Sequence, residues 1–158
     1  MGITLSFKPT SVLDEAVVEQ LKINCRALGP HTTWWSEMPA LLNVPKLGIL
    51  GMQKVSLTGY STNDGGYQKV DQQDNFLMMW NDINRTTVAL SRWAKEFGVG
   101  WVMELEGEPF GSIDENGIAS EELEGSLEEL LSMSNAPPSE PERATLIEEI
   151  RKRYASRW

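Results

Sequence analysis

Residues 98–117, GVGWVMELEGEPFGSIDENG, contain the pattern that decides the fold. Every second residue in 101–105 is a large apolar one, which is the period of a strand with one buried face. Residues 106–109 turn the chain back into a second strand over 110–113, and 114–117 are typical of another turn. These closely spaced reversals predict a small antiparallel sheet.

Several amphipathic helices are predicted around this sheet. The strongest begins at Asp71 or Asp74 and ends at Gly98, because apolar side chains recur between these positions at steps of three and four residues. Residues 84–87 favour a helix interior poorly, which indicates a break there. Since strands and helices do not alternate regularly, we expect an α+β fold, with a small antiparallel sheet packed against three to four amphipathic helices. The other helices are predicted over 11–28, 120–133 and 139–158.

One linker divides the chain. Residues 1–134 are expected to form a single α+β domain, and residues 135–158 a Pro-rich linker and a C-terminal amphipathic helix. The apolar stripe of that helix ends in Tyr154 and Trp158. We expect the helix to dock on its own domain. Packing on a second copy, which would give a homodimer, is the alternative.

The acidity of the chain is confined to one segment. The net charge is −9, yet residues 1–100 hold nine acids and nine bases. Residues 101–150 hold fourteen acids against Arg143 alone, and the last eight residues hold four bases. Nucleic acid and anionic lipid both require a basic face, so neither nucleic acid nor a membrane is expected as a partner.

Cofactor-dependent chemistry is not predicted. With one cysteine and one histidine, the chain cannot build a zinc site of the usual Cys/His type, and it has no phosphate-binding glycine loop. We interpret Cys25 as a buried thiol and His31 as an ordinary loop residue, rather than as a catalytic pair. Since no targeting or membrane-spanning segment is recognisable, a cytoplasmic location is expected.

Paired carboxylates and adjacent tryptophans raise a carbohydrate hypothesis. Glu104 and Glu106 are two residues apart on a predicted strand, so both are expected on one face, where they would serve as acid and base in glycoside cleavage. A solvated strand face is the simpler interpretation. Trp34 and Trp35 are adjacent in a loop and cannot easily both be buried, so one of them is a candidate sugar platform or interface anchor.

The segregated charge favours a different function. Ten acids and no base occur between Glu104 and Glu129, and on a hairpin and a helix they would attract a basic protein partner, although a solvated surface is the simpler alternative. We therefore predict a non-catalytic binding domain of inhibitor or immunity type. A carbohydrate-active or carbohydrate-binding protein, or a structural subunit assembled through the last helix, are the alternatives. The predicted contact residues are Glu104, Glu106, Glu108, Glu121, Glu122 and Glu124, with Trp34 or Trp35 as an apolar anchor.

Overall fold

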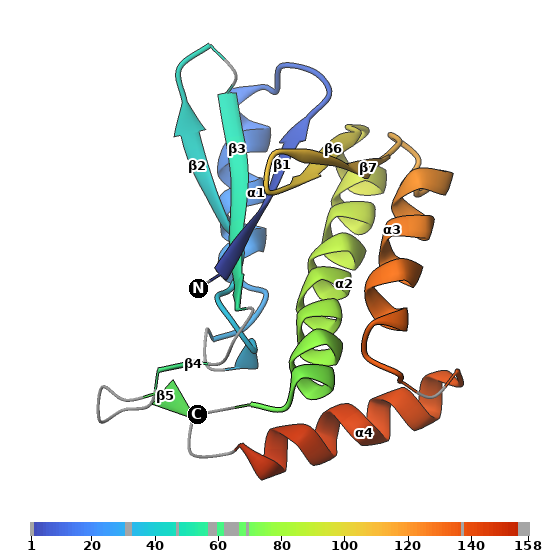
Figure 1. Cartoon of the computed structure of the whole chain (residues 1–158). Coiled ribbons are helices and arrows are strands. Elements are labelled where there is room, and N and C mark those ends of the chain that lie inside the picture. Colours follow the sequence, from blue (N-terminus) through green and yellow to red (C-terminus); the bar gives the residue numbers. More distant parts are fainter. Residues whose placement is uncertain are drawn as a thin grey trace.

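The computed structural model describes residues 2–30, 33–46, 48–56, 60–61, 67–68, 70–136 and 138–154. A five-stranded antiparallel sheet in the order β2-β3-β1-β6-β7 packs against helices, which confirms the predicted α+β fold (Figure 1). The sheet consists of β1 (Gly2–Pro9), β2 (Ala40–Val44), β3 (Gly48–Ser56), β6 (Trp101–Leu105) and β7 (Glu108–Ile113). The helices are α1 (Glu15–Arg26), α2 (Gln72–Phe97), α3 (Glu121–Ser132) and α4 (Glu140–Arg153), and β4 (Tyr60–Ser61) pairs with β5 (Tyr67–Gln68).

The central strand β1 fixes which face of the sheet is buried. It pairs antiparallel with β3 on one side and β6 on the other. Phe7 of β1 is opposite Met103 of β6, and both are buried in a core to which α1, α2 and α3 also contribute. Their neighbours Ser6 and Glu104, also a cross-strand pair, lie on the other face, because side chains alternate along a strand.

Helix α2 is continuous, so the predicted break at residues 84–87 is wrong. The polar side chains there find partners without interrupting the helix: Thr86 donates a hydrogen bond to Gln53 of β3, and Thr87 to the carbonyl of Ile83. These contacts outweigh the weak helix propensity of the segment. The predicted ends are confirmed, since Asp71 caps the first turn and Gly98 takes a left-handed φ of 65°.

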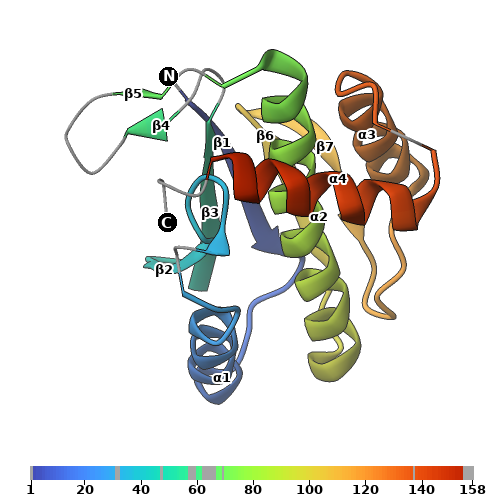
Figure 2. The same cartoon turned by 90° about the horizontal axis from the view of Figure 1, so that it is seen from below.

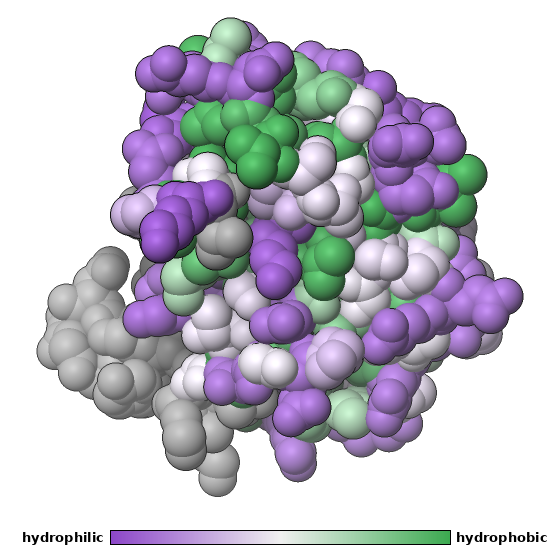
Figure 3. All heavy atoms as spheres, turned by 90° about the horizontal axis from the view of Figure 1, so that it is seen from above, coloured by the Kyte–Doolittle hydropathy of each residue, from purple (hydrophilic) through white to green (hydrophobic). Residues whose placement is uncertain are grey.

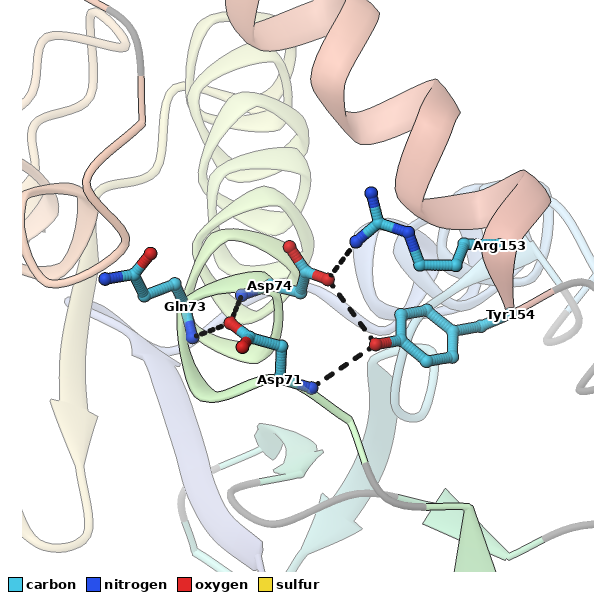
Figure 4. A network of polar contacts seen from close by, with 5 residues as sticks. All are labelled: Asp71, Gln73, Asp74, Arg153 and Tyr154. Atoms are coloured by element: carbon cyan, nitrogen blue, oxygen red, sulfur yellow. Dashed lines mark hydrogen bonds and ion pairs between the residues drawn. The ribbon is translucent and has the colours of Figure 1, made fainter.

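Helix α4 crosses the N-terminal end of α2 (Figure 2). Ile150 and Tyr154 are buried there with Trp35, whose ring meets that of Tyr154 edge-on at 5.8 Å. Polar contacts fix the same end: Arg153 pairs with Asp74 at 2.6 Å, and the hydroxyl of Tyr154 accepts from the Asp71 amide and donates to Asp74 (Figure 4).

The docking of α4 bears on two sequence predictions. The described part of its apolar side contacts α2 of the same chain. Trp158, with which the predicted stripe ends, lies outside the described residues. A homodimer formed through this helix stays a prediction.

Candidate functional site

The acidic residues of 104–129 lie on two adjacent elements, the β6–β7 hairpin and α3. Helix α3 packs against β7 and α2 (Figure 1). Ser120 caps the helix through a hydrogen bond from the Leu123 amide. Three exposed acids follow in its first turn, where the helix dipole favours negative charge. These are Glu121, Glu122 and Glu124.

A hollow of about 240 Å³ lies between the hairpin and α3. Its lining is mainly apolar and includes Phe110 and Leu130, both buried, together with Met133, which is 48% exposed. The exposed Glu108 of β7 and Glu129 of α3 border it from opposite sides. The arrangement suits a ligand group with an apolar stem and a positive end, because the stem would contact the lining while the cation meets both carboxylates.

Among the described residues, no cation forms an ion pair with these acids. In the part of the chain that the structure describes, the ion pairs are Lys22 with Glu19 and Arg153 with Asp74. The cationic end of α4 therefore pairs with α2, and no acid between 104 and 129 forms an ion pair within the described ranges. We call this surface, formed by the exposed acids of the hairpin and of α3, the acidic face.

Glu104 and Glu106 do not form the predicted same-face pair. Strand β6 ends at Leu105, and Glu106 lies in the hairpin turn with a positive φ of 52°. Its carboxylate accepts a hydrogen bond from the Thr4 amide at 2.6 Å. Glu106 thus joins the hairpin to β1, whereas Glu104 lies on the sheet face away from the core. The prediction that both carboxylates lie on one face of a strand is therefore wrong, and the carbohydrate alternative stays a prediction.

Trp34 and Trp35 are both buried, so the expectation that one of them is exposed is wrong. They are 1% and 0% exposed, respectively. The Trp35 indole donates to Asn75 at 3.0 Å, and its backbone amide donates to the buried Asp82. Because α2 supplies these polar partners, two adjacent loop residues can be buried together. Neither tryptophan lines the hollow of the acidic face.

Two residues at the hollow of the acidic face were not predicted from the sequence. Glu129 and Met133 were not among the predicted contact residues, although both line the hollow. The helical period contained the signal, since Glu122, Ser126, Glu129 and Met133 recur at steps of four, three and four residues on one side of α3. The apolar residues from the hairpin were not predictable in the same way, because their position beside α3 is a tertiary contact.

Hydrophilic residues occupy much of the face of the molecule seen from above (Figure 3). On the face seen from above, hydrophilic residues separate the hydrophobic ones into small patches (Figure 3).

The one cysteine has the chemistry of a core residue, as predicted. Cys25 is 3% exposed, and its thiol donates to the carbonyl of Pro39. Burial raises the pKa of the Cys25 thiol from 9.0 to about 11, and the nearby Arg26 opposes this only in part. The thiolate that a nucleophile requires is therefore disfavoured at neutral pH. His31 lies outside the described residues.

The raised pKa of Cys25 predicts a loss of stability at alkaline pH. Between pH 9.0 and about 11 the unfolded chain releases the thiol proton while the folded chain keeps it, so stability falls as pH rises. Relative to Cys25→Ala, the wild type should lose about 1 kcal/mol of unfolding free energy per pH unit in this window. Urea denaturation of both proteins at several pH values measures the difference. Parallel curves for the two proteins would contradict a buried, neutral thiol.

Within the described residues, no group of three or more His, Cys, Asp or Glu side chains is placed to hold a metal ion. The same residues contain no helix with the length and apolar character needed to cross a membrane.

No match to the chain was found among protein families, curated proteins or solved structures.

Proposed function

We propose that the protein is a non-catalytic binding protein that uses the acidic face to hold a basic partner protein, in the manner of an inhibitor or immunity protein of the cytoplasm. The observation that carries this proposal is the hollow between the hairpin and α3. It combines an apolar lining with two exposed carboxylates, Glu108 and Glu129, that form no ion pair within the described chain.

The chemistry of the acidic face determines what the partner presents. An arginine or lysine side chain would place its aliphatic stem against Phe110 and Leu130 and its charge between Glu108 and Glu129. The exposed acids of the first turn of α3 extend the negative potential beyond the hollow. Such a field accelerates the encounter with a basic protein and weakens as salt is added.

Charge reversal at the acidic face tests the proposal. The triple variant Glu108→Lys, Glu122→Lys and Glu129→Lys should weaken binding of the basic partner by at least about tenfold, because attraction becomes repulsion at the contact. Immobilised wild type and variant are used to capture proteins from a lysate of the source cells, with identification by quantitative mass spectrometry. The affinity of the purified partner is then measured by calorimetry at several salt concentrations.

A matched variant separates local contact from net charge. Glu15→Lys, Glu96→Lys and Glu148→Lys make the same total change at exposed positions outside the acidic face. This control should retain the partner. Equal capture by wild type and by the variant of the acidic face would refute the proposal, and so would equal loss of the partner in both triple variants.

A further inference from the structure

A second hollow is lined in part by arginines, whereas the hollow of the acidic face is bordered by carboxylates. It has a volume of about 270 Å³ and lies beside α2. Arg85 and Arg92 both line it and are seven residues apart, which places them on one side of the helix. Leu28 and Val88 supply apolar lining, and Val88 is 53% exposed. A basic surface of this kind is unexpected in a chain with a net charge of −9.

The structure holds two of the cationic side chains close together. The Arg85 guanidinium lies over the Trp34 ring at 3.8 Å and donates to the carbonyl of Thr33 at 2.9 Å. Arg151 of α4 donates to the same carbonyl oxygen at 3.4 Å. Two guanidinium groups therefore converge on one acceptor. Arg151 does not itself line the hollow, but its positive charge acts on Arg85, which does, so both charges would attract an anion bound beside Arg85.

The arginines have no carboxylate partner among the described residues. No ion pair with a described residue is formed by Arg85, Arg92 or Arg151. The charge of Asp82 acts on Arg85, but the two carboxylate oxygens of Asp82 accept from the amides of Trp35 and Ser36. The Nε of Arg151 is buried and has no hydrogen-bond partner in the described chain.

The electrostatic state of Arg85 agrees with this geometry. Burial lowers the pKa of the Arg85 guanidinium below its ordinary value; the charge of Asp82 opposes this, and the charge of Arg151 lowers the pKa by a smaller amount. A bound anion would reduce the repulsion between the two guanidinium groups.

We propose that this hollow binds a small dianionic phosphate, either the free ion or a monoester of a small organic molecule. Guanidinium groups present paired N–H donors that match phosphate oxygens, and Arg85 is already oriented by its contacts with Trp34 and Thr33. The hollow is smaller than a typical drug-sized site, which restricts the ligand to a compact one. Its apolar lining provides a place for the organic group of a monoester.

Titration with inorganic phosphate, phenyl phosphate and acetate tests the proposal. The full-length protein is observed by ¹H–¹⁵N NMR at about pH 7.5, where a phosphate monoester is nearly dianionic, and at constant ionic strength. At least one phosphate compound should give saturable shifts of the Trp34 indole N–H and the Arg85 Nε–H, with a Kd near or below about 1 mM. Tighter binding of phenyl phosphate assigns the ligand to monoesters, and equal binding assigns it to the free ion.

Single arginine variants locate the site. Arg92→Gln removes a lining guanidinium and should weaken phosphate binding by about tenfold. Arg151 lies beside Arg85 without lining the hollow, so Arg151→Gln should weaken binding less. Lys95→Gln removes the same charge from an exposed position on α2 outside the hollow and should leave the affinity unchanged. The proposal is overturned by unsaturable shifts, by equal binding of acetate, or by a Lys95→Gln effect as large as that of Arg92→Gln. Because none of these residues belongs to the acidic face, these results are independent of partner binding.

Discussion

A Gly111→Ala variant should lose about 3 kcal/mol or more of unfolding free energy, because α3 lies directly on this position of β7. A Cβ atom at Gly111 would lie 2.4 Å from the Cα of Leu123 and 2.5 Å from its backbone nitrogen. The clash is with helix backbone, which cannot rotate away as a flexible side chain can. Gly111 also has a φ of 142°, which side chains rarely adopt. Urea denaturation followed by circular dichroism measures the loss.

Gly125→Ala is the matched control for this substitution. Gly125 is exposed on α3, and an added Cβ would meet no atom within 4 Å. Because alanine favours a helix interior over glycine, this variant should be more stable than the wild type by up to about 1 kcal/mol. A Gly111→Ala protein with the stability of the wild type would show that α3 does not rest on β7. The hollow of the acidic face would then lose its structural basis.

The elements that sequence predicted well are those specified by neighbouring residues. Alternating side chains define β6, and Asp71 and Gly98 end α2 as capping rules require. Ser120 likewise opens α3. Each of these features depends on residues only a few positions apart, so no knowledge of the tertiary structure is needed.

The features that sequence did not predict depend on contacts between distant segments. Glu106 leaves the strand pattern because its carboxylate and backbone both bond to Thr4 of β1. Arg85 and Arg151 are far apart in the chain and meet only because α4 crosses α2. Local propensity contains no information on either contact. The acidity of residues 101–150 was evident from the composition. The hollow bordered by some of these acids was not.

The burial of Trp35 predicts the second large effect on stability. Trp35→Ala should lose about 3–5 kcal/mol of unfolding free energy, because it empties the cluster in which α4 meets α2. The substitution removes the edge-on contact with Tyr154 and the hydrogen bond to Asn75, whose amide oxygen is buried. Thermal and urea denaturation measure the loss. Hydrogen exchange should show that α4 is the helix most affected.

Trp35→Phe distinguishes a core residue from an interface anchor. Phenylalanine keeps most of the apolar contact and loses the indole donor to Asn75, so the cost should be about 1–3 kcal/mol and the fold should persist. If Trp35 acts only in the core, this variant captures the basic partner as well as the wild type does. A folded Trp35→Phe protein that fails to bind the partner would instead require Trp35 to leave the core on binding, and the acidic face would then not be the whole contact surface.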